Sequence, residues 1–140
     1  MPPAHAMLLS VLALGLLHLV MLLALYATRL PAMAKARISA QATSRPGALD
    51  SLPAWARNAA ANYNNLAEAP TVFYAVVIAI VLLGQANAFY VTLAWTYVAL
   101  RWVHSAIQAT VNRVIWRFGV FSLSWLVLGI MIVRALLGFL

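Results

Sequence analysis

A run of about 20 residues, 7–28, contains no Asp, Glu, Lys or Arg and limits what this chain can fold into. A helix of this length crosses the hydrocarbon core of a bilayer, whereas buried helices of soluble proteins are shorter. Three further, predominantly apolar stretches follow at 57–83, 88–108 and 117–139. The sequence therefore predicts an all-α membrane protein, a four-transmembrane-helix bundle formed by residues 1–140 as a single domain.

The composition supports a membrane environment. The chain is 66% hydrophobic and only 8% charged, whereas soluble domains are about half apolar and about a quarter charged. Such a chain cannot cover a water-facing surface with polar groups, so we expect membrane lipid as its partner. The net charge of +7 is compatible with nucleic-acid binding. However, the basic residues cluster beside apolar runs and form no solvated stripe, so we expect no nucleic-acid partner.

The first apolar run has a competing interpretation as a cleaved signal peptide. We disfavour it because the run is longer than a signal-peptide core and no Lys or Arg precedes it. The chain has no cysteine, which excludes disulfides, thiolate metal ligands and a cysteine nucleophile. No metal-ligand spacing occurs either. Any thiol chemistry must therefore use a thiol that belongs to a ligand.

Residues 31–56 form the only long polar stretch, which we expect to be a cytoplasmic loop with a short helix. Its helix breakers are Pro31, Pro46, Gly47 and Pro53. Within the second span, Pro70 should kink the helix because proline lacks a backbone donor. The turn at 84–87 carries no charge.

The distribution of basic residues predicts the orientation. Eight of the nine Lys and Arg residues flank the first and third connections, and only Arg134 lies near the other face. By the positive-inside rule the first group faces the cytoplasm, so both termini should lie on the opposite side. The Ala-, Leu- and Arg-rich, Lys-poor composition is compatible with a bacterial inner membrane.

Ionisable residues inside the predicted spans are the candidates for function, since unpaired charges are costly there. Counting from the turn at 84–87, Glu68, Arg101 and His104 lie at similar depth. We predict that Glu68 faces the bundle and pairs with Arg101 or contacts His104, with a neighbouring subunit as another source of its partner. Hydrogen bonding that merely holds helices together explains the same residues equally well. His5 and His18 have no polar companions in the sequence pattern and are expected to be structural.

Helical spacing groups the polar residues into two stripes at matching depth on antiparallel neighbours. They would form a polar cavity open to the cytoplasm. The members are Arg57, Ala61, Asn64 and Glu68 in the second span, and Arg101, His104, Gln108 and Asn112 in the third.

Two motifs resemble those of the membrane-associated proteins in eicosanoid and glutathione metabolism, the MAPEG family, which includes microsomal glutathione transferases and prostaglandin E synthase. The first is an N-x-x-E motif followed by a proline and a phenylalanine, and the second is an R-x-x-H motif followed by two arginines. The order and spacing agree over nearly the whole chain. The matching residues are Asn65, Glu68, Pro70, Phe73, Arg101, His104, Arg113, Arg117 and, at the end of the first span, Arg29.

The resemblance implies a homotrimer that binds glutathione as co-substrate between adjacent subunits near the cytoplasmic face. Arg117 would be the catalytic residue, since a guanidinium favours the thiolate. The sequence departs from glutathione-binding relatives at Ala61, Tyr63 and Phe121, and Gln108 stands where they usually have tyrosine. The implied glutathione-binding residues are Arg29, Asn65, Glu68, Arg101, His104 and Gln108.

Three functional hypotheses follow. The favoured one is a glutathione-dependent transferase or peroxidase that acts on a hydrophobic small-molecule substrate, a lipophilic electrophile entering from the bilayer. The alternative is a non-catalytic lipid-binding or scaffold protein of the same fold. A transporter ranks last because no discontinuous helix pair or inverted repeat is evident.

Overall fold

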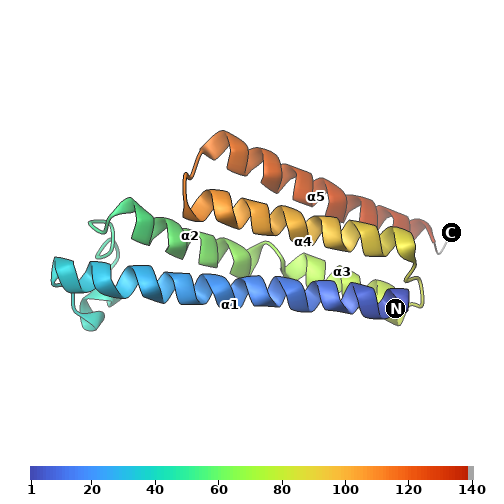
Figure 1. Ribbon diagram of the computed structural model, residues 1–140, viewed down its shortest axis with the longest axis horizontal. Coiled ribbons are helices and arrows are strands. Elements are labelled where there is room, and N and C mark those ends of the chain that lie inside the picture. Colours follow the sequence, from blue (N-terminus) through green and yellow to red (C-terminus); the bar gives the residue numbers. More distant parts are fainter. Residues whose placement is uncertain (139–140) are drawn as a thin grey trace.

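A computed structural model describes residues 1–138 of the chain. Helix α1 lies beside the α2–α3 pair, and the α4–α5 hairpin packs on them (Figure 1). The N terminus and the end of α5 lie at one end of the molecule, and the α1–α2 connection lies at the other (Figure 1). The helices are α1 (Pro3–Ala36), the 3₁₀ helix η1 (Ala40–Ser44), α2 (Ala54–Glu68), α3 (Thr71–Leu82), α4 (Ala88–Ala109) and α5 (Val114–Leu137).

Among the described residues, three helical segments are long and apolar enough to cross a membrane: α1, α2 together with α3, and α5. Helix α4 has 22 residues and does not reach the same hydropathy. The cause is its polar stripe, which is buried against the other helices. A helix with such a stripe is shielded from lipid by its neighbours, so the structure places α4 within a bundle of four helical segments.

Helix α5 begins at Val114, three residues before the expected start of the fourth span at 117. The expected end of that span, residue 139, lies outside the described residues.

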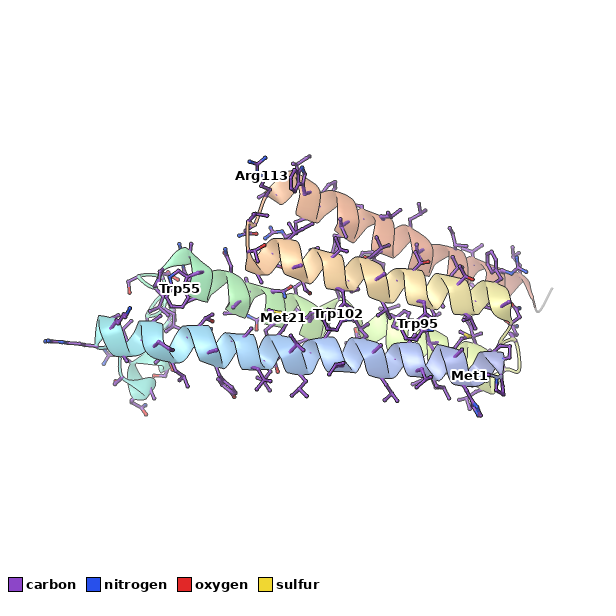
Figure 2. The ribbon with its side chains drawn as sticks, in the orientation of Figure 1. Met1, Met21, Trp55, Trp95, Trp102 and Arg113 are labelled. Atoms are coloured by element: carbon purple, nitrogen blue, oxygen red, sulfur yellow. The ribbon has the colours of Figure 1, made fainter. Side chains whose placement is uncertain are left out.

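The core forms where one face of each helix meets its neighbours. On α1, residues that recur every three or four positions are buried, among them Met7, Leu14, Leu17 and Met21. This spacing places them on one side of a helix. The other side of α1 and the outer side of α5 carry exposed leucines, isoleucines and valines, and side chains project outward along both helices (Figure 2). These outward faces suit lipid as their solvent.

The expectation that Pro31 ends the first helix is wrong. Helix α1 continues through Pro31 to Ala36. A proline fits helical φ and removes only one hydrogen-bond donor, so helices tolerate it where packing supports the next turn. The helix ends at Arg37, whose φ of 55° is left-handed, and the Ile38 N–H donates to the Met33 carbonyl at 3.0 Å.

Two interruptions of the helical backbone set the positions of the remaining helices. Pro70 separates α2 from α3, as the sequence predicts. After α3, Gly84 adopts a φ of +69°, which glycine accommodates without strain. The Asn87 side chain then accepts hydrogen bonds from the Phe89 and Tyr90 N–H groups and starts α4.

Candidate functional site

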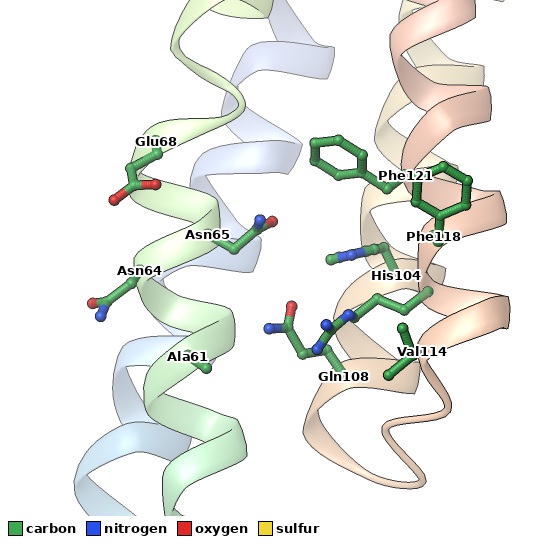
Figure 3. Close-up of a pocket in the computed structure, with 10 residues that line it drawn as sticks. Ala61, Asn64, Asn65, Glu68, His104, Gln108, Val114, Phe118 and Phe121 are labelled. Carbon is green, nitrogen blue, oxygen red and sulfur yellow. The ribbon is translucent and has the colours of Figure 1, made fainter.

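A cavity of about 510 Å³ lies between α2 and the α4–α5 hairpin. One wall belongs to α2, and the opposite wall comes from the end of α4 and the first two turns of α5 (Figure 3). Helix α5 begins away from α2 and approaches the bundle only along its length (Figure 1). The lining residues are Ala61, Asn64, Asn65, Glu68, His104, Gln108, Val114, Arg117, Phe118 and Phe121.

The two predicted polar stripes differ in burial. On α4 the stripe faces the bundle interior, because Arg101, His104 and Gln108 are all buried. On α2 the predicted stripe is not buried, since Ala61 and Glu68 are exposed. The reason is that α2 packs through its small and apolar positions, which leaves its polar stripe at the rim of the cavity. Ala61, Asn64 and Glu68 nevertheless line the cavity opposite the α4 stripe, as the sequence predicts. The buried residues of α2 are Ala56, Ala59, Asn62 and Leu66.

The predicted contact of Glu68 with Arg101 or His104 is wrong within the single chain. Glu68 is exposed and points away from the wall that carries His104, whereas Asn65 points toward that wall (Figure 3). The Asn65 Oδ1 atom accepts a hydrogen bond from Nη2 of Arg101 instead. Glu68 follows Asn65 by three residues, which rotates its side chain by about 300° around the helix, about 60° short of a full turn. On this last turn of α2 before the Pro70 break, Asn65 faces α4 and Glu68 does not.

Arg101 is 0% exposed although it carries a charge. Its guanidinium carbon lies 5.6 Å from the centre of the Phe121 ring, a cation–π contact that stabilises only part of the charge. Its Nε and Nη1 atoms have no hydrogen-bond partner among the described residues. A buried, partly unsatisfied guanidinium is costly in a protein interior, and a nearby anion would offset this cost.

Two more buried polar atoms on the cavity wall lack partners in the described chain. They are Nδ1 of His104 and Oε1 of Gln108. Buried polar groups in proteins nearly always make hydrogen bonds, so unpaired atoms beside a cavity indicate positions where a polar ligand or water binds. We call these two residues the polar floor of the cavity, together with Arg101, which is buried behind the lining and contacts Asn65 and Phe121.

Arg117 reaches the cavity from the first turn of α5 and is held by a relay of amide side chains. Its Nη1 atom donates to Oδ1 of Asn112 at 2.8 Å, and Nδ2 of Asn112 donates to Oδ1 of Asn58 at 2.9 Å. Asn112 occupies the α4–α5 connection with a φ of 47°, while Asn58 belongs to α2. The relay therefore connects the Arg117 guanidinium to α2, the helix that forms the opposite wall of the cavity.

Two apolar residues of the site, Val114 and Phe118, were not predicted from the sequence, whereas Phe121 was named only as a departure from glutathione-binding relatives. Val114, Phe118 and Phe121 line the cavity from α5, at spacings of four and three residues that place them on one helical face. Phe121 also lies 5.9 Å, between ring centres, from His104. The helical spacing of these residues beside Arg117 is visible in the sequence. It could not be recognised as part of a site, because most other residues of this span are also apolar.

Of the seven residues expected to form the site, five line the cavity and one, Arg101, is buried beside it. Arg29 does not line it. It lies on α1, half-buried, near the end that leads to the α1–α2 connection. The five lining residues are Asn65, Glu68, His104, Gln108 and Arg117.

The expectation that His18 has no polar companions is also wrong. Its Nε2 atom lies 2.5 Å from the Leu66 carbonyl oxygen, and its Nδ1 atom lies 3.2 Å from the Tyr74 hydroxyl. Both partners are distant in sequence, so helical periodicity within one span cannot reveal them.

The fold and the cavity define an all-helical integral membrane protein with a basic, partly apolar pocket between its second and last helices. Residues 7–137 match the model of the MAPEG family. The chain belongs to this family, whose fold serves membrane-bound, glutathione-related transferases and eicosanoid metabolism. Comparison with curated proteins found no match, and comparison with solved structures found none.

Proposed function

We propose that the protein is a glutathione-dependent transferase or peroxidase that acts on lipophilic electrophiles within the membrane. The observation that carries the proposal is the position of Arg117, a half-buried guanidinium held at a cavity with a polar floor and an aromatic wall. The polar floor suits the ionic reactant, glutathione, and the aromatic wall suits the apolar electrophile.

The residues present fit glutathione. Its two carboxylates suit arginines, and its ammonium group suits a carboxylate. Oε1 of Gln108 lacks a partner in the cavity lining, and two guanidinium nitrogens of Arg101 lack partners beside it. Glu68 belongs to the rim on α2, although in the single chain its carboxylate points away from the α4 wall. The residues at and beside the cavity therefore include groups of both signs, as the binding of a zwitterionic tripeptide requires.

The chemistry that these residues support is thiolate attack. The thiol loses its proton to solvent at the cavity mouth, and the Arg117 guanidinium stabilises the anion. The sulfur then forms a bond to the electrophilic carbon, and the leaving group departs with its bonding electron pair. With a hydroperoxide, the thiolate sulfur bonds to the terminal oxygen, the O–O bond breaks, and the alkoxide takes a proton from solvent and leaves as an alcohol. The resulting sulfenic acid condenses with a second glutathione to give the disulfide and water. The exposed apolar faces of Val114 and Phe118 give a lipophilic reactant access from the bilayer.

The proposed assembly is a homotrimer in which a neighbouring subunit completes the site. Glu68 is exposed on the outer face of α2 at membrane depth, where an unpaired carboxylate is costly. Arg29, which the single chain leaves away from the cavity, is a candidate partner from the adjacent copy. Both residues then contribute to one site at the subunit interface.

The activity test uses the detergent-solubilised protein with millimolar glutathione and a chromogenic electrophile. We expect glutathione to raise the unfolding temperature, and Arg117→Ala to retain much of this shift while its turnover falls about 100-fold. Arg134→Ala is the matched control, since Arg134 lies at the far end of the same helix and does not line the cavity. Absence of both glutathione stabilisation and turnover in the wild type would contradict the proposal.

A second candidate is a lipid-binding or scaffold protein without catalysis. Phe121 favours it, because an aromatic ring without a hydroxyl adds apolar surface where a hydrogen-bond donor would serve glutathione. Lipid that co-purifies in native mass spectrometry and is displaced by fatty acid but not by glutathione would support this candidate over the enzyme.

We also propose that the cavity opens toward the cytoplasm of a bacterial cell, with both termini on the opposite side. The basis is the clustering of basic residues at the cavity end. Because the chain has no cysteine, Ser44→Cys and Ala86→Cys each introduce the only thiol. An impermeant maleimide added to intact spheroplasts should label Ala86→Cys only, and labelling of Ser44→Cys alone would reverse the orientation.

A further inference from the structure

The break between α2 and α3 leaves the backbone carbonyl of Leu66 without its helical partner. In a continuous helix the carbonyl of Leu66 would accept from the N–H of residue 70, but Pro70 has no N–H. Leu66 is 0% exposed, so bulk water does not replace the missing donor. The oxygen is instead 2.5 Å from Nε2 of His18, which arrives from α1. A histidine side chain thus stands where the proline removed a hydrogen bond.

The contact with Leu66 fixes the role of Nε2 of His18. A carbonyl oxygen only accepts, so Nε2 carries the proton. The other ring nitrogen, Nδ1, lies 3.2 Å from the Tyr74 hydroxyl. Nδ1 also lies 3.1 Å from the Leu14 carbonyl oxygen of the same helix.

The imidazole therefore holds both sides of the break. Leu66 belongs to the last turns of α2, and Tyr74 belongs to the first turn of α3. A second carbonyl freed at the break, that of Glu68, accepts from the Thr71 hydroxyl at 2.8 Å. The break is thus stabilised by side chains, and only His18 anchors it to another helix among these donors.

We propose that His18 is a positioning residue of the pocket: by supplying the donor that Pro70 lacks, it holds the turn of α2 that carries Asn65 and Glu68. The effect of this turn on glutathione binding rests on the proposed function, whereas the hydrogen bond itself does not. The alternative is that His18 has only a packing role between the helices. A side chain of similar volume would then preserve stability whichever residue stands at position 70.

A double-mutant cycle separates these two roles. In Pro70→Ala, residue 70 regains an N–H that can bond the Leu66 carbonyl, so His18 is no longer needed as a donor. We expect His18→Leu to raise the half-saturating glutathione concentration about threefold to tenfold and to lower the unfolding temperature by several degrees. In the Pro70→Ala background the same substitution should change both quantities much less. Equal effects in both backgrounds, or no effect in either, would overturn the proposal.

Three further variants sharpen the cycle. His18→Gln keeps a side-chain donor and should recover most of the glutathione response lost in His18→Leu. His5→Leu, an exposed histidine on the same helix, should change neither quantity. Pro31→Ala restores an N–H at a different proline and should not rescue His18→Leu. Rescue by Pro31→Ala, or failure of His18→Gln to recover function, would indicate general stabilisation and count against the positioning role.

The readouts keep the two proposals apart. If wild-type protein shows no response to glutathione, the proposed function fails. The unfolding temperatures of the same four proteins of the cycle still decide whether His18 supplies the missing donor. A ¹⁵N NMR spectrum of histidine-labelled protein gives an independent check, with a proton on Nε2 of His18 expected and an Nε2 without a proton contradicting the proposal.

Discussion

The side chain of Asn65 on α2 accepts a hydrogen bond from the buried guanidinium of Arg101 on α4. This bond connects the helix that precedes the proline break to the α4–α5 hairpin, and it lies directly beside the cavity. A neutral amide satisfies one donor of the guanidinium and leaves its charge uncompensated. The arrangement gives the site a structural contact and a residual attraction for anions at the same time.

The first prediction concerns the stability of this contact. Asn65→Leu removes the acceptor and leaves Arg101 buried with still fewer partners, so the free energy of unfolding should fall by about 2–3 kcal/mol. Asn64→Leu, on the exposed side of the same turn, should change it by less than about 0.5 kcal/mol. Adding Arg101→Leu to Asn65→Leu should restore part of the loss, as measured by unfolding in mixed micelles. A double variant less stable than Asn65→Leu would contradict this account.

The second prediction concerns the relay that holds Arg117. Asn112→Gly tolerates the left-handed φ of 47° but removes the acceptor of the Arg117 hydrogen bond. We expect turnover to fall about tenfold with a smaller change in the glutathione KM, because the guanidinium is released from one position. Arg37→Gly is the matched control, since Arg37 also has a positive φ of 55° and lies away from the cavity. Equal losses in both variants would show that the effect comes from the backbone and not from the relay.

The third prediction concerns Phe121. Phe121→Tyr places a hydroxyl on the ring that contacts Arg101 and His104. One added hydrogen bond to a bound polar ligand should lower the half-saturating glutathione concentration about threefold to tenfold in a thermal-shift titration. Phe118→Tyr adds the same hydroxyl one turn earlier and serves as the control. A weaker response to glutathione in Phe121→Tyr would favour the lipid-binding alternative.

The fourth prediction tests the subunit interface. Glu68→Arg should weaken the trimer by like-charge repulsion with Arg29 of the adjacent copy, and Arg29→Glu in the same chain should restore it. Cross-linking in native membranes measures the trimer fraction. Asp50→Arg, which changes the other acidic residue in the exposed connection, should leave it unchanged. Loss of trimer that the second substitution does not rescue would remove Arg29 from the proposed interface.

The helices themselves could be predicted from the sequence because lipid demands long apolar segments with internally satisfied backbones. Arg101, His104 and Gln108 recur on one face of a single helix, so their burial together also followed from periodicity. The same reasoning failed for α2, where packing through small residues turned Glu68 outward. Periodicity gives the faces of a helix but not which face its neighbours cover.

The sequence alone determined that this chain is a helical membrane protein, that Pro70 interrupts its second span, and that its motifs resemble those of the MAPEG family. These features depend on composition or on neighbouring residues in the sequence. They can therefore be recognised without knowing how the helices pack. Only the tertiary structure decided that Asn65 rather than Glu68 meets Arg101, that Asn112 and Asn58 hold Arg117, and that His18 occupies the place of the donor missing at Pro70. Each of these contacts depends on the rotation of one helix against another, which is set by the packing of the whole bundle and by no single segment.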